Sequence, residues 1–181
     1  MPRIHRKTLF ALIVALLATC LSTSLTLAHA GAWAIVSSPN QGTLGNHLYG
    51  VATVSANDIW AVGYKLSVYY YYTVILHWNG SKWSEVSSPN PYEESNIFYG
   101  VAALSATSVW AVGSAGGQTL VARWNGTRWA RVSSPNVNTF DTLQAAATVS
   151  ATGDVWAVGE DLQTINRASY ARTLVEECRA C

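Results

Sequence analysis

The chain has 181 residues, of which half are hydrophobic, 11% are aromatic and only 12% are charged. Three of its eleven basic residues lie within the first ten positions, which leaves eight basic against ten acidic residues in the remainder. No basic patch is present, and this argues against nucleic acid or an anionic membrane surface as a partner. The aromatic content argues against a disordered tail and suits a compact β protein.

The first thirty residues have the pattern of an export signal. Arg3, Arg6 and Lys7 precede an uncharged apolar run from Thr8 to Leu27, and Ala-His-Ala at 28–30 gives the small-x-small pattern of a cleavage site. We therefore expect a signal helix in residues 1–30 and a secreted or cell-surface protein. The alternative is an N-terminally membrane-anchored protein, because about 20 apolar residues span a bilayer.

Three short motifs recur along the rest of the chain. Val-Ser-Ser-Pro-Asn occurs at 36–40, 86–90 and 132–136, Trp-Ala-Val-Gly at 60–63, 110–113 and 156–159, and Trp-Asn-Gly at 78–80 and 124–126. In every copy, the Trp three residues before Val-Ser-Ser-Pro-Asn lies 27 residues before the Trp of Trp-Ala-Val-Gly. Only the connection from Trp-Ala-Val-Gly to the next Trp-Asn-Gly varies, which predicts a structural repeat with one surface loop of variable length.

Each repeat predicts four short strands separated by turn residues. In the first unit the runs are Leu48–Ser55, Ile59–Tyr64, Thr73–Trp78 and Lys82–Ser87, and Phe98–Ser105 corresponds to the first of them. Asn79-Gly80 predicts a two-residue hairpin of type I′, since both central positions of that turn need positive φ. Trp33–Ser38 predicts the last strand of a preceding unit.

Tandem four-stranded units predict an all-β fold, a partial or truncated β-propeller of about three blades after the signal helix. The units are expected at about 41–90, 91–136 and 137–175, with 31–40 as the last strand of a preceding blade and 176–181 as a tail outside the repeat. The strand of small residues suits the innermost position of a blade. The tryptophans suit contacts between neighbouring blades, and they are Trp33, Trp60, Trp78, Trp83, Trp110, Trp124, Trp129 and Trp156.

Two segments carry a resemblance to known proteins. Ser-Ala-Asn-Asp-Ile-Trp-Ala-Val-Gly at 55–63 and Leu-His-Trp-Asn-Gly-Ser-Lys-Trp-Ser-Glu-Val at 76–86 are similar to a repeat of exported bacterial propeller proteins, and more distantly to tectonin and kelch-type blades. The resemblance covers residues 33–175 and implies the blade fold without any particular activity. The third copy departs from the pattern, because Cys178 stands where Trp124 stands in the second.

Candidate ligand-binding residues fall into two groups. They are Tyr69, Tyr70, Tyr71, Tyr72, Asn46, Asn96 and Asp141. The four consecutive tyrosines could stack on sugar rings or anchor a partner protein, or they could simply extend the third strand. The other three residues each precede the innermost strand by the same interval, and they could form a polar ring around a ligand or stabilise turns.

The sequence contains no clear catalytic or metal-binding constellation. Asp58 and Asp154 occupy the same turn of the repeat, where turn chemistry explains a carboxylate. Cys178 and Cys181 lack the second ligand pair of a zinc site, so a tail disulfide or incidental cysteines explain them better. We expect no metal and no cofactor.

The leading hypothesis is a secreted, non-catalytic propeller module that binds protein or carbohydrate. One alternative is a truncated fragment of a longer propeller protein without independent function, and another is a propeller glycosidase or lyase. Closed propellers have roughly four to eight blades, so a homo-oligomer that completes the propeller is a further expectation.

Overall fold

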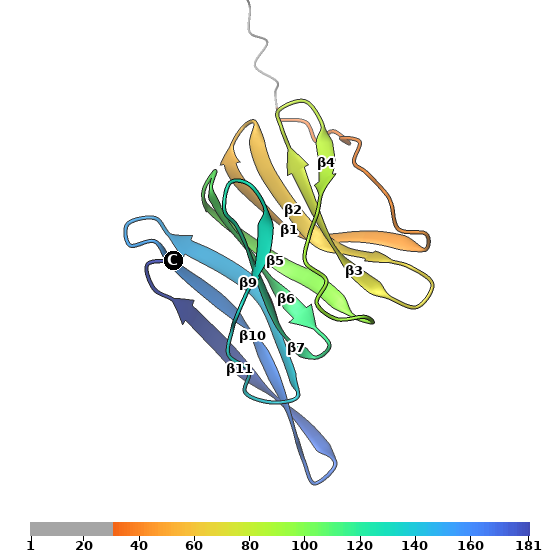
Figure 1. Ribbon diagram of the computed structural model, residues 1–181, viewed down its shortest axis with the longest axis vertical. Coiled ribbons are helices and arrows are strands. Elements are labelled where there is room, and N and C mark those ends of the chain that lie inside the picture. Colours follow the sequence, from red (N-terminus) through yellow and green to blue (C-terminus); the bar gives the residue numbers. More distant parts are fainter. Residues whose placement is uncertain (1–30) are drawn as a thin grey trace, which may run out of the picture. The chain divides into compact units, whose positions relative to one another are not determined.

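The computed structural model describes residues 31–181, and eleven strands in three antiparallel sheets are present in this range (Figure 1). The first sheet holds β1 (Gly45–Ser55), β2 (Asp58–Leu66), β3 (Tyr71–Trp78) and β4 (Trp83–Val86). The second holds β5 (Asn96–Ser105), β6 (Ser108–Ala115), β7 (Gln118–Trp124) and β8 (Trp129–Val132). The third holds β9 (Phe140–Val149), β10 (Asp154–Ile165) and β11 (Ala168–Cys178).

The export signal and its alternative, a membrane anchor, concern residues 1–30 and lie outside the described residues. Among residues 31–181 there is no helix with the length and apolar character needed to cross a membrane.

The sheets follow one another as blades. In each sheet the strands keep chain order, and β5 packs against β1 on one side and β9 on the other, so the second sheet lies between the first and the third. Consecutive antiparallel meanders with neighbouring innermost strands are the arrangement of propeller blades. The predicted all-β fold of about three blades is therefore confirmed, and the sheets are named blade 1, blade 2 and blade 3 below.

The Trp of each Trp-Ala-Val-Gly motif occupies the same place in its blade. Each pairs with an alanine of the innermost strand and with a polar residue of the third strand: Trp60 with Ala52 and His77, Trp110 with Ala102 and Arg123, Trp156 with Ala147 and Glu177. The equal spacing in the sequence thus reflects equal register in the sheets.

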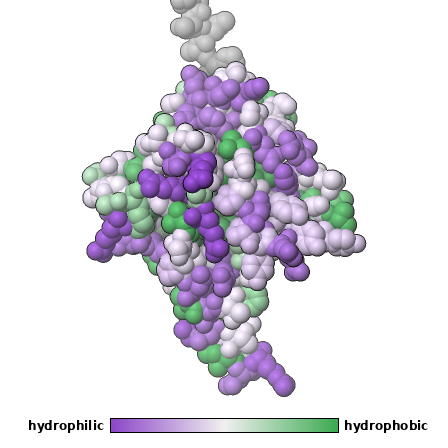
Figure 2. Space-filling view, viewed as in Figure 1, coloured by the Kyte–Doolittle hydropathy of each residue, from purple (hydrophilic) through white to green (hydrophobic). Residues whose placement is uncertain are grey.

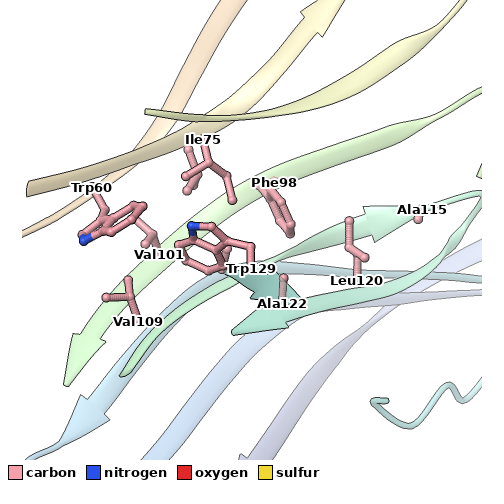
Figure 3. Close-up of a cluster of buried hydrophobic side chains, with 11 residues drawn as sticks. Trp60, Ile75, Phe98, Val101, Val109, Ala115, Leu120, Ala122 and Trp129 are labelled. Carbon is pink, nitrogen blue, oxygen red and sulfur yellow. The ribbon is translucent and has the colours of Figure 1, made fainter. Parts of the chain in front are cut away.

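The largest hydrophobic cluster lies between blades 1 and 2 (Figure 3). Trp60 and Ile75 of blade 1 meet Phe98 and Trp129 of blade 2, and the ring centroids of Trp60 and Trp129 are 5.4 Å apart. Trp124 of blade 2 also approaches Trp60, at 4.9 Å. Fully buried side chains of this size each contribute about 1.5–3 kcal/mol, so this interface holds the two sheets together.

A polar clip joins each outer strand to the third strand of the same blade. The buried Thr73 donates its backbone N–H to Asn90 Oδ1 (2.7 Å), and its hydroxyl donates to the carbonyl of Pro89 (3.0 Å) and is within 2.7 Å of Ser88 Oγ. The buried Thr119 makes the same contacts with Ser134, Pro135 and Asn136. The Ser-Pro-Asn sequences at 88–90 and 134–136 are therefore explained by their bonds to a buried threonine.

The last residue of Trp-Ala-Val-Gly must be glycine because another backbone passes very close. A Cβ atom on Gly63, Gly113 or Gly159 would lie only 1.8–1.9 Å from a carbonyl oxygen of the innermost strand. Each of these glycines sits beside a bulge in that strand, where the pairing shifts by one residue. The motif is thus a requirement of backbone packing within the blade.

Two sequence predictions about local structure are wrong. Residues 32–42 have no regular structure, so the strand expected at Trp33–Ser38 is absent. The equivalent strands β4 and β8 each pair with the third strand of their own sheet. Residues 33–38 have no such partner, because no sheet precedes blade 1 among the described residues. The turn at Asn79-Gly80 is a four-residue loop, since Trp78 pairs with Trp83. Only Gly80 has positive φ there, because Asn79 Oδ1 accepts the backbone N–H groups of two following residues.

The third unit also differs from the prediction. β11 continues to Cys178, so the first half of the expected tail is paired with β10. β10 and β11 form a long hairpin whose two turn residues, Asn166 and Arg167, both have positive φ. The two-residue turn of type I′ therefore occurs here, at a place that the sequence analysis did not assign.

Gly113→Ala should destabilise the protein by about 3 kcal/mol, because the new methyl group would force the backbone of β5 away from β6. Urea unfolding followed by tryptophan fluorescence measures this change. Gly31→Ala is the matched control, since a Cβ there would meet nothing within 4 Å. Equal unfolding midpoints for the two variants would contradict the close-approach explanation.

Candidate functional site

The three polar residues considered either for a ligand-binding ring or for turn stabilisation act as anchors for the loops that precede the innermost strands. Asn46 Oδ1 accepts the backbone N–H of Gly42 (2.8 Å). The fully buried Asn96 does the same for Tyr92 (3.0 Å) and donates Nδ2 to the carbonyl of Tyr92 (2.6 Å). The carboxylate of Asp141, also fully buried, accepts the backbone N–H groups of two loop residues. These bonds match the turn-stabilising alternative. Asn96 also donates Nδ2 to the carbonyl of Tyr71 in β3 of the neighbouring sheet (3.3 Å), whereas the buried Asp141 is turned toward its own loop.

The four consecutive tyrosines are divided between the loop and the beginning of β3. Tyr69 is mostly exposed in the loop between β2 and β3, and Tyr70 accepts a backbone hydrogen bond from Ser67 (2.9 Å). Tyr71 and Tyr72 are already part of β3, so their side chains point to opposite faces of the sheet. Tyr69, Tyr70 and Tyr72 remain in contact, with ring centroids 6.4 Å apart for the first pair and 6.2 Å apart for Tyr70 and Tyr72. Tyr71 is separate from them and joins the cluster described next.

Three residues that sequence reasoning did not single out occupy bulges in the innermost strands. Tyr49 in β1, Tyr99 in β5 and Gln144 in β9 are each skipped in the pairing with the neighbouring strand. Bulges re-aim side chains and are frequent beside functional sites. The signal in the sequence was the repeated Tyr-Gly-Val-Ala at 49–52 and 99–102.

Each bulge residue has a partner directly after Trp-Ala-Val-Gly in the next strand. Tyr49 hydrogen-bonds Tyr64, Tyr99 hydrogen-bonds Ser114, and Gln144 Nε2 lies 3.4 Å from Glu160 Oε1. Desolvation raises the pKa of Tyr64, and the hydrogen bond with Tyr49 raises it further. The hydroxyl proton of Tyr64 is therefore engaged with Tyr49. Desolvation also raises the pKa of Tyr99.

Five aromatic rings are contiguous on this surface. The imidazole of His47 stacks on Tyr64 at 4.7 Å, Tyr71 meets Tyr64 at 5.2 Å, and Tyr49 lies 5.8 Å from Tyr64 and 5.4 Å from Tyr99. We name these five residues the aromatic row. His47, Tyr49 and Tyr71 are exposed, while the other two are half-buried. On the face of the molecule seen in Figure 2, hydrophobic residues form small separate patches among hydrophilic ones.

Two aspartates near the tryptophans are engaged within their own blades. Asp58 Oδ1 lies 2.9 Å from His77 Nε2, and the His77 ring packs on Trp60 at 4.2 Å. Asp154 accepts the backbone N–H of Ala180 (2.9 Å) and the hydroxyl of Thr152, and these bonds lower the pKa of its carboxyl group. The two aspartates thus lie in different blades with separate structural partners.

The sulfur atoms at the carboxyl end are joined. Cys178 and Cys181 form a disulfide, one of the two interpretations left open by the sequence. Within residues 31–181, no three His, Cys, Asp or Glu side chains gather closely enough to hold a metal ion.

The fold and this surface define an all-β protein of propeller-type blades with exposed aromatic residues on the innermost strands. No family model matches the chain, and no curated protein matches its sequence. Among solved structures, the chain is similar to YCF48 bound to D1 peptide, with 14% sequence identity and a TM-score of 0.46. The match covers 68% of this chain and 40% of that chain, so this chain spans less than half the length of that protein.

One half-buried carboxyl group has an unusual pKa. Glu176 of β11 stands where blades 1 and 2 have the buried residues Leu76 and Ala122. Desolvation, together with the negative charge of Asp141, raises the pKa of Glu176 to about 7. Ionisation of this group therefore opposes folding.

Glu176→Gln should remove a pH dependence of stability. The penalty in the wild type is absent below about pH 4.5, grows as the pH rises toward 7, and is complete above 7, because the folded-state pKa is raised above the ordinary 4.5. The variant should gain about 1 kcal/mol over the wild type at pH 8 and nothing at pH 4, allowing for solvent screening. Urea unfolding at both pH values measures the difference. Glu177→Gln, whose carboxylate pairs with Arg179 at 2.8 Å, is the control; a similar gain there would contradict the assignment.

Proposed function

We propose that this protein is an exported, non-catalytic binding module that holds a partner protein through the aromatic row. The supporting observation is the row itself. Five aromatic side chains from three strands of blade 1 and one strand of blade 2 lie in contact, and three of them are exposed. Tyrosine combines a large contact area with a hydroxyl group at low cost in side-chain entropy, which is why it dominates binding surfaces.

The geometry of the row supports a protein partner more than a carbohydrate. A sugar ring stacks on an aromatic face, but His47 and Tyr64 already cover one face of each other, with planes inclined by 19°. Carbohydrate binding is kept as the second candidate because Tyr49 still presents an exposed ring.

A catalytic role finds no support in the arrangement of carboxylates. Hydrolysis of a glycosidic bond needs two carboxyl groups on either side of one bond, whereas Asp58 and Asp154 belong to different blades and are bound to His77 and to the backbone of Ala180. Any glycosidase or lyase activity of the purified protein that is lost in the Asp58→Ala, Asp154→Ala double variant would contradict the non-catalytic proposal.

Tyr49→Ser and Tyr99→Ser should each weaken binding of a selected peptide at least tenfold, because both remove a contact ring from the centre of the row. Peptides are selected from a displayed library against the purified protein, and affinities are measured by calorimetry. Tyr170→Ser is the matched control, since Tyr170 on the β10–β11 hairpin has the same exposed fraction as Tyr49, 54%.

A glycan array run in parallel separates the two candidates. One outcome is that the array selects glycans while the displayed library yields no peptide. If the Tyr49→Ser and Tyr99→Ser variants then lose glycan binding to the same extent, the partner is a carbohydrate and not a protein. The alternative from the sequence, a shortened chain without independent function, predicts no ligand in either assay from protein that is folded by circular dichroism.

A further inference from the structure

The two ends of the blade array expose residues that are buried inside it. Toward the following blade, blade 1 presents Trp60, Val62 and Ile75, and blade 2 presents Trp110, Val112 and Val121, all of them buried. The equivalent residues of blade 3 are Trp156, Val158 and Val175, which are 40%, 45% and 58% exposed. Blade 3 therefore has the surface of a blade that another blade should cover.

Blade 1 has exposed apolar residues on the face that points away from blade 2. Phe98 and Val101 of blade 2 are buried against blade 1. Their equivalents in blade 1 are Leu48 and Val51, which are 47% and 67% exposed, whereas Ala61, Val74 and Leu76 on the same face are buried. The exposed part of this face is therefore the part formed by β1. The two ends of the array are thus the two halves of an interface that the chain already forms between blades 1 and 2.

The threonine clip is incomplete in blade 3. Thr173 occupies the position of Thr73 and Thr119, but it is exposed and makes no clip contact within residues 31–181. Those two threonines are 1% exposed, and each is bonded to a Ser-Pro-Asn turn. β11 consequently has an unpaired edge along which a further strand can add.

Within residues 31–181, the first Ser-Pro-Asn turn, at residues 38–40, lacks the threonine partner that the other two copies have. Asn40 Nδ2 donates to the carbonyl of Ser38 at 3.2 Å, as Asn90 does to Ser88 and Asn136 to Ser134. The turn is therefore formed, yet no threonine among the described residues is bonded to it.

This turn cannot meet Thr173 of its own chain in the arrangement seen here. Ser38–Asn40 lines a pocket with His47, Leu48 and Val74, on the face of blade 1 that points away from blade 2. Blade 3 packs on the opposite side of blade 2. Turn and threonine thus lie at opposite ends of the array.

A cavity marks the place of a missing tryptophan. In blade 2, Trp124 and Trp129 pack on Trp60 of the preceding blade. In blade 3, Cys178 stands at the position of the first of these, and within residues 31–181 no side chain occupies the place of the second. A cavity of about 310 Å³ remains against Trp110, with Ala157 and Cys178 on its other walls.

We propose that a second copy of this chain completes blade 3. Its segment Trp33–Asn40 adds to the free edge of β11 as the fourth strand, antiparallel, with Val36 opposite Val175. This is the register of Val86 with Ile75 and of Val132 with Val121. Its Ser-Pro-Asn turn then clips Thr173, its Trp33 enters the cavity beside Trp110, and its blade 1 covers Trp156.

A ring closes when blade 3 of each copy is covered by blade 1 of the other copy. Head-to-tail contacts give a closed assembly when the rotation between copies returns to the start. Two copies with three blades each give six blades, within the range of roughly four to eight that closed propellers adopt.

Cysteine cross-linking tests both the register and the second copy. Opposed residues in antiparallel strands have Cα atoms about 4.5–5.5 Å apart, which suits a disulfide. An oxidised mixture of Val36→Cys and Val175→Cys proteins should give a covalent dimer on a non-reducing gel, while each variant alone and the wild type give none. The Val36→Cys, Val175→Cys double variant should also give a covalent dimer. A cross-link confined to one chain, or none in the mixture, would overturn the proposal.

Sedimentation equilibrium of the purified wild type should give twice the mass of the chain, and any other mass would overturn the six-blade ring. Trp156→Lys and Thr173→Arg should weaken self-association at least tenfold, with unchanged circular dichroism. Val68→Lys is the control, because Val68 is 60% exposed in the β2–β3 loop, outside both surfaces. An equal loss in this control would also count against the proposal.

Discussion

The packing of tryptophan between adjacent sheets is the interaction on which the rest of the structure depends. A four-stranded sheet alone has no core, and it becomes stable only when its faces are covered. Trp60 is covered by Trp124 and Trp129 of the next blade, and this contact fixes the distance and register between the two sheets. The constant interval between tryptophans in the sequence follows from this requirement, because each must arrive at the same place in its sheet.

The close approach of two backbones within each blade connects the framework to the candidate binding surface. Gly63 and Gly113 leave no room for a side chain beside the innermost strand, and that strand bulges next to them. The bulge turns Tyr49 and Tyr99 out of the ladder, where they meet Tyr64 and Ser114. A structural constraint thus places the residues that we propose for binding, so substitution of the glycines should disturb the surface as well as the fold.

Much of the framework could be predicted from the sequence, whereas most of the candidate site could not. Thr73–Trp78 was expected as a strand and lies within β3, because alternation of side chains is a local property. Asn96 was noticed for its position, but its bonds to Tyr92 could not be foreseen, since they depend on the path of the preceding loop. Tyr49 was missed because the repeated Tyr-Gly-Val-Ala does not by itself show that the tyrosine bulges, since a bulge is a mismatch between two paired strands.

The sequence by itself determined that the chain is a tandem array of short strands, because repeat length, strand period and turn residues are all local features. Only the tertiary structure decided which of the equivalent residues are covered. Trp60 and Trp156 occupy equivalent positions in the Trp-Ala-Val-Gly motif, but one is buried and the other is 40% exposed. The difference arises because burial depends on the neighbouring blade, and a residue's own sequence does not record whether that neighbour is present.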